Sequence, residues 1–217
     1  STAAASIKAL ERMGQLEKGA YRQRITSLPT AGIDLAKILN TALEVSRVSS
    51  GDFDPTLGEV IALWGFDSPT PHLPDPAALS VALESVGYQK LDHPSGNDIS
   101  VSIDLGGVTK GYAVDEAVRV LHDSGVAGGI VNGGGDLRTF GLKPGGKLWK
   151  IGVQDPDNPQ ELAGVLSIRE AAVATSGDYQ RYFEKDGTRY HHILDPATGY
   201  PARSGFRGTT VFVPTCL

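Results

Sequence analysis

The sequence of 217 residues has little of several features that define large classes of protein. Its single cysteine, Cys216, excludes a disulfide bond within the chain. No apolar run approaches the roughly 20 residues that a membrane-spanning helix needs. Acidic residues outnumber basic ones by 25 to 20, so the chain lacks the basic excess expected of a protein that binds nucleic acid. Residues 1–10 carry one lysine and no cleavage pattern, and we expect no signal peptide there.

What the sequence does contain is ordinary for a soluble globular protein, with 40% hydrophobic and 21% charged residues. The length allows one large domain or two small ones, each with a buried core. No repeat, charge block or low-complexity linker divides the chain, so we expect a single domain over residues 1–217. The 27 glycines and 13 prolines fall between periodic segments, where they indicate turns.

Four segments have the periodicity of helices. Apolar residues recur at helical spacing over 35–45 and again over 113–121. The pairs Asp54–Pro55 and Asp75–Pro76 each place a capping carboxylate before a proline at the first helical position. We expect a helix after each pair, with Gly87 closing the second one.

The remaining periodic segments alternate as strands do. Apolar residues point to one side and polar residues to the other over 99–105, which predicts a half-buried strand. Further strands are expected over 128–132, 147–156, 163–170 and 188–196. The order of strand, helix and strand between 99 and 132 suggests a βα unit, whereas the later strands have no helices between them. We therefore predict the α+β class, a mixed sheet core flanked by helices.

The segment "IDLGGVTK" concentrates polar and flexible residues just before a helix. Asp104 is expected at the carboxyl end of its strand, and Gly106 and Gly107 would let the backbone turn tightly and approach a ligand. The N–H groups that begin a helix attract phosphate, and Lys110 adds a positive charge. The segment is thus a candidate pyrophosphate-binding turn. Spacing alone favours a simple strand-to-helix turn, because the segment matches neither common phosphate-binding motif.

Three other segments could contribute to a site. "NGGGDLR", which contains Asp136, is a glycine turn that either leaves space for a ligand or forms a loose hairpin. Ser176 lies where a helix or turn is expected to begin, as a cap or a phosphate ligand. His191 and His192 adjoin on a strand, so they face opposite sides and at most one enters a given site. That histidine would be either a general base or a structural residue.

Acidic residues gather at the expected turns: Asp52, Asp54, Asp104, Asp136 and Asp178. Their oxygens suit a hard ion such as Mg²⁺ better than zinc, and no cluster of cysteine and histidine has zinc spacing. Carboxylates at turns are also common helix caps, so both interpretations stay open.

Five segments, taken in order, resemble one family. They are "GDFDPTLGEVIALWGF", "IDLGGVTKGYAVDEA", "VNGGGDLRTFG", "VATSGDYQRYF" and "HHILDPATGYP", and they span about residues 51–201. Together they resemble the ApbE-like FAD:protein FMN transferases, or flavin transferases. The resemblance implies an α+β fold with FAD in a groove and Mg²⁺ beside the pyrophosphate.

The resemblance also implies a reaction: FMN is transferred from FAD to a threonine or serine hydroxyl of a target flavoprotein, and AMP is released. Such targets resemble subunits of redox complexes such as sodium-pumping quinone reductases. Some members instead hydrolyse FAD to FMN and AMP, so an FAD pyrophosphatase is an alternative. A flavin-binding module without catalysis is a third.

Roles carry over only at matching positions. The resemblance implies that Asp52, Phe53 and Asp54 line the flavin pocket. Asp104 and Lys110 would contact FAD, and Ser176 is the further candidate for its phosphates. The carbonyl of Gly107 would bind Mg²⁺, Leu194 would touch FAD through its backbone, and His192 would be the active-site histidine.

This sequence departs from the family pattern in three places. Thr109 stands where the family usually has alanine. The family's early Gly-Thr strand is not recognisable in residues 1–30, and its Ala-Asp-Ala-x-x-Thr-like segment, which supplies further metal ligands, does not follow "TTVFVPTCL". We therefore expect a domain truncated at both ends. The resemblance implies a periplasmic or membrane-anchored protein, with a lipid anchor outside this chain, or alternatively a cytoplasmic one.

Overall fold

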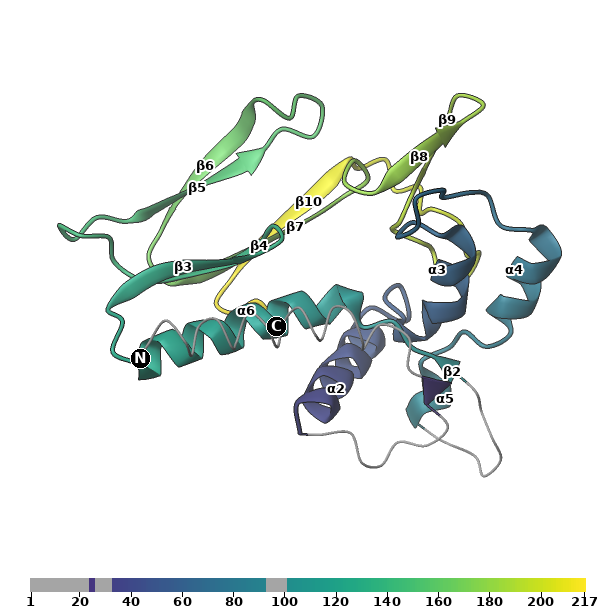
Figure 1. Ribbon diagram of the computed structural model, residues 1–217, viewed down its shortest axis with the longest axis horizontal. Coiled ribbons are helices and arrows are strands. Elements are labelled where there is room, and N and C mark those ends of the chain that lie inside the picture. Colours follow the sequence, from purple (N-terminus) through teal and green to yellow (C-terminus); the bar gives the residue numbers. More distant parts are fainter. Residues whose placement is uncertain (1–23, 26–32, 93–100) are drawn as a thin grey trace. The chain divides into compact units, whose positions relative to one another are not determined.

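The computed structural model describes residues 24–25, 33–92 and 101–217, with helices before residue 124 and mainly antiparallel strands after it (Figure 1). The first two residues of the strand expected over 99–105 lie outside the described residues. The observed mixture of helices and sheets confirms the α+β class. Within the described ranges, every helix is too short or too polar to pass through a bilayer.

The described residues form two compact units. Unit 1 contains 109–177 and 206–217, and unit 2 contains 24–25, 33–92, 101–108 and 178–205. The division falls inside one helix, α6 (Gly106–Asp123). Each unit has its own hydrophobic cluster, and the single domain expected from the sequence stays a prediction.

Unit 2 contains most of the helices. They are α2 (Ile33–Val48), the 3₁₀ helix η1 (Pro55–Leu57), α3 (Gly58–Trp64), α4 (Pro76–Leu83) and α5 (Gln89–Asp92). The two predicted caps are confirmed: the Asp54 carboxylate accepts the N–H of Thr56, and the Asp75 carboxylate accepts that of Ala78. The helix after Asp75 ends at Leu83, earlier than the predicted end at Gly87.

The core of unit 2 surrounds Trp64, at the end of α3. Its indole is fully buried, and its Nε1 donates to the carbonyl of Gly199 at 2.8 Å. Four aromatic rings lie around it with centroids 5.5–6.2 Å away: Phe66, Phe183, Tyr190 and Tyr200. Two of them belong to the hairpin of β8 (Tyr182–Lys185) and β9 (Thr188–His191), so this core joins the hairpin to α3.

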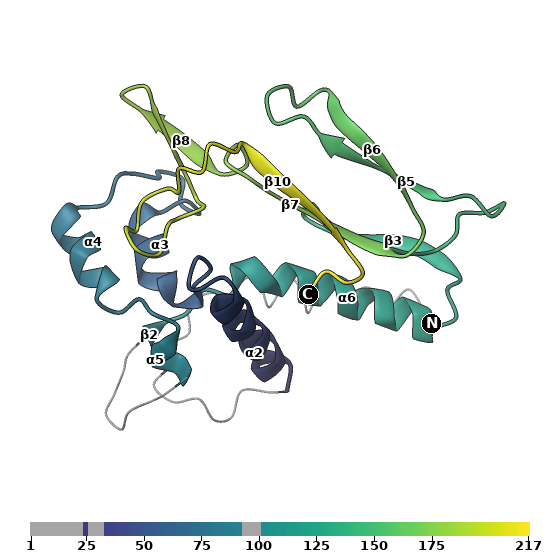
Figure 2. The same ribbon diagram turned by 180° about the vertical axis from the view of Figure 1, so that it is seen from behind.

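Unit 1 is built on a four-stranded antiparallel sheet in the order β10-β7-β4-β3. The strands are β3 (Gly128–Gly133), β4 (Asp136–Gly141), β7 (Ala171–Gly177) and β10 (Gly208–Val213). The view from behind shows β10 beside β7, as their register requires (Figure 2). Buried residues of α6, including Val114 and Val118, pack on Val131 and Phe140 of the sheet. A second hairpin joins β5 (Trp149–Gln154) and β6 (Leu162–Ile168).

The expected βα unit is wrong, because the strands before and after α6 belong to different sheets. β2 (Val101–Ser102) pairs antiparallel with β1 (Arg24–Ile25), while β3 belongs to the separate four-stranded sheet. The predicted strand over 99–105 is correspondingly short, because after Ser102 the chain leaves its partner. Its buried face was predicted correctly, since Val101, Ile103 and Leu105 are all buried.

Candidate functional site

Asp104 lies between β2, which ends at Ser102, and α6, which begins at Gly106, so it precedes the helix rather than ending a strand. Its Oδ1 accepts the N–H of Gly106 at 2.7 Å, so the carboxylate binds one of the N–H groups that a helix leaves unpaired at its beginning. Gly106 and Gly107 are not among the glycines with positive φ, and both belong to the first turn of the helix. The predicted tight glycine turn is therefore wrong, because the carboxylate begins the helix directly.

Gly107 leaves room for a neighbouring ring rather than making a turn. A Cβ at this position would lie 2.7 Å from Cε2 of Phe53, closer than real Cβ contacts, so the missing side chain lets the ring rest on the helix. The backbone N–H of Asp104 also donates to the carbonyl of Pro55 at 2.8 Å. The structure thus brings the 52–55 loop against the beginning of α6, which joins two of the segments predicted to hold flavin.

Asp54 supports that loop from inside. Its side chain is buried, with 6% of the residue exposed. Oδ1 accepts the N–H and the hydroxyl of Thr56 at 2.8 and 2.5 Å, and Oδ2 accepts the N–H of Tyr88 at 2.8 Å. Because a buried carboxylate is stable only when its oxygens are paired, these bonds fix the loop that presents exposed Asp52 and half-buried Phe53.

In unit 1, Lys110 of α6 forms an ion pair with Asp136 at the start of β4. Its Nζ lies 2.8 Å from Oδ2 of Asp136. Further along the same two elements, the guanidinium of Arg138 lies 2.8 Å from Oδ1 of Asp115. Along α6 the cation Lys110 comes before the anion Asp115, whereas along β4 the anion Asp136 comes before the cation Arg138. Sliding β4 along α6 would bring like charges together, so the two ion pairs oppose it.

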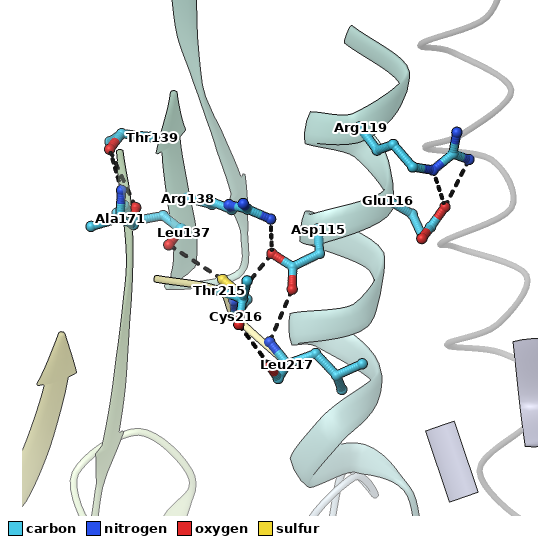
Figure 3. A network of polar contacts seen from close by, with 10 residues as sticks. All are labelled: Asp115, Glu116, Arg119, Leu137, Arg138, Thr139, Ala171, Thr215, Cys216 and Leu217. Carbon is cyan, nitrogen blue, oxygen red and sulfur yellow. Dashed lines mark hydrogen bonds and ion pairs between the residues drawn. The ribbon is translucent and has the colours of Figure 1, made fainter. Parts of the chain in front are cut away.

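Asp115 also holds the segment that ends with Leu217 (Figure 3). Its Oδ1 accepts the N–H of Cys216 at 3.1 Å, and its Oδ2 accepts the N–H of Leu217 at 3.0 Å. Gly111 allows this segment to approach, since a Cβ there would lie 2.3 Å from the carbonyl oxygen of Cys216. Cys216 and Leu217 are thereby fixed to α6 at Gly111 and Asp115, and Gly111 directly follows Lys110 in the sequence.

The Cys216 thiol has partners that the sequence did not indicate. Its Sγ donates to the carbonyl of Leu137 at 3.4 Å, and burial, together with the negative charges of Asp115 and Asp136, raises the pKa of the thiol to about 12. A thiol with this pKa stays protonated and unreactive at neutral pH. Cys216 is therefore a packing residue.

Ser176 lies near the end of a strand, two residues before a turn that begins at Asp178, and not at the beginning of a helix. It belongs to β7, where it is exposed and opposite Thr209 of β10. The predicted cap is wrong, because pairing with a strand more than 30 residues away determines the conformation of this segment. A role toward phosphate stays a prediction.

His191 and His192 lie at the end of β9 and directly after it. The backbone N–H of His192 donates to the carbonyl of Arg181 at 3.1 Å. The Nδ1 of His191 is buried and has no hydrogen-bond partner. Burial lowers the pKa of His191, with the charge of Asp178 acting in the opposite direction. The ring of His191 is therefore favoured in its neutral form.

Leu194 lies in the segment after the β8–β9 hairpin, which backbone hydrogen bonds hold in place. It pairs with Pro201 in an isolated bridge, and its buried side chain belongs to the same hydrophobic cluster as Leu57 and Trp64. This cluster connects the His192 segment with the η1–α3 region that follows the 52–55 loop. Unit 2 thus contains seven of the nine predicted site residues, while unit 1 contains Lys110 and Ser176.

The fold has the class and arrangement of solved flavin transferases. The chain superimposes on the ApbE protein of Thermotoga maritima with a TM-score of 0.83 and 32% identity, over 99% of this chain and 74% of the other. For the flavinyl transferase ApbE of Pseudomonas stutzeri, solved in its apo form, the TM-score is 0.81 and the identity 29%, over 98% and 72% of the two chains.

The sequence comparisons agree with the structural ones. The profile of the ApbE family matches residues 7–217. The chain therefore belongs to the ApbE family. It is 34% identical over 200 residues to the FAD:protein FMN transferase of Treponema pallidum and 32% identical over 194 residues to that of Salmonella typhimurium. These matches include 83% and 84% of this chain but 55% of each relative, so the chain spans little more than half of their length.

Sequence reasoning missed the contacts made by Asp115, Arg138 and Cys216. The strand β4 was itself not predicted, and it places positions 136 and 138 on one face. No local pattern indicated which helical residues would meet them, since Asp115 and Arg138 are 23 positions apart and Asp115 and Cys216 are 101 apart.

Proposed function

We propose that this chain carries the FAD-binding part of an FAD:protein FMN transferase. The observation that carries the proposal is the match of the ApbE family over residues 7–217, together with relatives of that name at 30–34% identity. The proposed reaction is Mg²⁺-dependent transfer of FMN from FAD to a threonine or serine hydroxyl of a target flavoprotein. AMP is the leaving group.

The reaction forms one phosphorus–oxygen bond and breaks another. The acceptor hydroxyl attacks the phosphorus that carries riboflavin, and the bond to the AMP phosphate breaks. The hydroxyl proton passes to His192 or to a nearby carboxylate. Lys110 offsets the negative charge of the pyrophosphate. In unit 2, the Phe53 ring and the beginning of α6 offer an apolar surface beside helix N–H groups, which suits a flavin joined to phosphate.

Mg²⁺ enters the proposal through the family resemblance, which assigns it the Gly107 carbonyl; when bound, it would offset charge on the pyrophosphate. Among the described residues, no group of three or more histidine, cysteine, aspartate or glutamate side chains could hold a metal ion. Asp104 binds the N–H of Gly106, and Asp136 pairs with Lys110. The described side chains do not form a metal site on their own.

The test uses the longest natural polypeptide that contains this sequence, incubated with FAD, MgCl₂ and a flavoprotein subunit of a sodium-pumping quinone reductase. We expect the target to keep yellow fluorescence through denaturing electrophoresis and AMP to appear in equal amount. A His192→Ala variant and a target whose acceptor threonine is replaced by alanine serve as controls. If intact enzyme binds FAD but never labels a target, the transferase proposal is wrong.

The same assay separates the alternatives. AMP and free FMN without labelled protein would identify an FAD pyrophosphatase, and FAD binding without AMP would identify a flavin-binding module. A periplasmic or membrane-anchored location, with the cytoplasm as alternative, is part of the proposal and is tested by fractionating the native host with an antibody to this chain. Recovery in the cytoplasmic fraction would contradict a periplasmic location.

A further inference from the structure

We propose that Asp136 is a positioning residue that orients the Lys110 ammonium toward the pyrophosphate of FAD. This inference rests on the proposed function, in which Lys110 binds FAD. The two side chains lie 2.8 Å apart, with 34% of Lys110 and 16% of Asp136 exposed. A lysine on a flexible four-carbon stem otherwise samples many rotamers, and fixing it at the moment of binding costs conformational entropy.

The backbone of Asp136 is held by the turn that precedes it. Gly133 and Asp136 are paired in the β3–β4 hairpin, so Gly134 and Gly135 alone make the turn. Their φ values of +71° and +103° are ones that residues with a side chain rarely adopt. The Asn132 side chain accepts the N–H of Gly135 at 2.9 Å and closes the turn. This accounts for Gly134 and Gly135: their turn places the Asp136 carboxylate at a defined position.

The ion pair between Arg138 and Asp115 holds the strand on the other side of Asp136 from the turn. Arg138, two residues along β4, is bonded to Asp115 of α6, and Asp115 is bonded in turn to Cys216 and Leu217. Asp136 therefore cannot follow Lys110 if the lysine moves, and the lysine side chain is the mobile member of the pair. An ammonium has three N–H donors. One bond to Asp136 leaves two donors for phosphate oxygens, so Asp136 and a phosphate can bind the same lysine together.

The experiment measures equilibrium binding of FAD and of riboflavin, by quenching of flavin fluorescence, in the longest natural polypeptide. Its variants are Asp136→Ala, Asp136→Asn, Lys110→Ala and the double variant. We expect Asp136→Ala to raise the Kd for FAD about tenfold, and Asp136→Asn, which keeps an acceptor but no charge, about threefold. Affinity for riboflavin, which lacks phosphate, should not change. The control is Glu116→Gln, which removes an exposed ion pair from the same helix and should leave both affinities unchanged.

The double variant decides whether Asp136 acts through Lys110. If it does, Lys110→Ala and the double variant bind FAD equally, because the second change has nothing left to orient. Additive losses, equal losses for riboflavin, or tighter FAD binding in Asp136→Asn would each overturn the inference while leaving the proposed function standing. Failure of the unaltered protein to bind FAD would overturn both. Asp136→Asn is nearly isosteric, so it gives the result if the alanine variant does not fold.

Discussion

The two units hold their candidate residues by different means. In unit 2, a hydrophobic cluster with Trp64 at its centre holds the His192 segment through Leu194, and the 52–55 loop that precedes η1 is fixed by hydrogen bonds to the buried Asp54 carboxylate. In unit 1, carboxylates hold Lys110, Cys216 and Leu217, and the neighbouring hydrophobic cluster is built mainly from small side chains such as Val114 and Ala117. Aromatic burial is non-directional, whereas ion pairs and hydrogen bonds have fixed geometry.

This difference suggests that the two units have different roles in binding FAD. The surface proposed for the flavin ring needs only apolar area at roughly the right place, which packing supplies. The charge proposed for the pyrophosphate must lie within hydrogen-bond distance of particular oxygens, which only a directed network can ensure. Substitutions should therefore have different effects in the two units. Loss of packing should unfold unit 2, and loss of a single charge should disturb unit 1 locally.

The largest effect is expected for Trp64→Ala. The indole is fully buried, contacts four aromatic rings and donates to the Gly199 carbonyl, so its removal leaves a cavity and an unpaired acceptor. We expect unfolding to become easier by about 3–5 kcal/mol, measured by urea denaturation. Tyr182→Ala, which truncates an exposed aromatic residue of β8 in the same unit, is the matched control. A loss below about 1 kcal/mol for Trp64→Ala would show that the aromatic cluster is not the core of unit 2.

The next effect is expected for Asp115→Ala. This change leaves the Arg138 guanidinium and the N–H groups of Cys216 and Leu217 without their acceptor. We expect a loss of about 2–3 kcal/mol, smaller than for a fully buried pair because Arg138 is partly exposed.

Hydrogen exchange at the amide of Leu217 provides a local readout of the same change, and exchange there should become faster. Asp123→Asn removes an exposed carboxylate of the same helix that also pairs with an arginine, and it should cost less than about 0.5 kcal/mol. Equal losses for the two variants would mean that Asp115 is an ordinary surface charge.

Local features of the fold were predictable from the sequence, because their partners are two or three residues away. The caps at Asp54 and Asp75 and the Gly134–Gly135 turn belong to this group. Asp104 has the same kind of local signal, since its carboxylate meets the N–H of Gly106. The alternating pattern over 99–105 concealed that signal, because alternate residues are buried there even though the backbone leaves the strand.

Features that depend on distant partners were not predictable from one sequence. Ser176 follows a pattern typical of a helix cap, yet its backbone is in a strand because residues 208–213 pair with 172–177. The same limit applies to the site. The resemblance indicated that Lys110 matters, but only the fold shows that Asp136 lies beside it and that the segment ending at Leu217 lies against Gly111.

Two glycines of α6 provide a finer test of the difference between the units. At Gly111, in unit 1, an added Cβ would meet the backbone oxygen of Cys216 at 2.3 Å, and a backbone held by Asp115 cannot move away cheaply. At Gly107, in unit 2, the added atom would meet the edge of the Phe53 ring, which can rotate. Alanine favours a helix interior over glycine by about 1 kcal/mol, a gain that applies at Gly111 and is smaller at Gly107 in the first turn.

We therefore expect Gly111→Ala to destabilise the protein by about 1–2 kcal/mol and Gly107→Ala to be nearly neutral. Alkylation of Cys216 at neutral pH, normally slow because of the raised pKa of its thiol, should accelerate only in Gly111→Ala. A neutral or stabilising Gly111→Ala would show that the last residues do not lie against the helix.

The smallest effect concerns His191 in unit 2, whose ring is only partly buried. Burial lowers its pKa in the folded protein below the usual value of about 6.5, while Asp178 and Arg189 act on it with opposite signs. Between the folded and unfolded pKa values, the unfolded chain binds more protons, so the free energy of unfolding should rise with pH through that window and fall as the pH drops below about 6.5. His191→Gln should flatten this part of the profile, measured by urea denaturation between pH 4.5 and 7.5. If the free energy of unfolding of His191→Gln depends on pH as in the unaltered protein, burial of this ring does not contribute to the pH dependence, and the stability of unit 2 does not depend on the charge of His191.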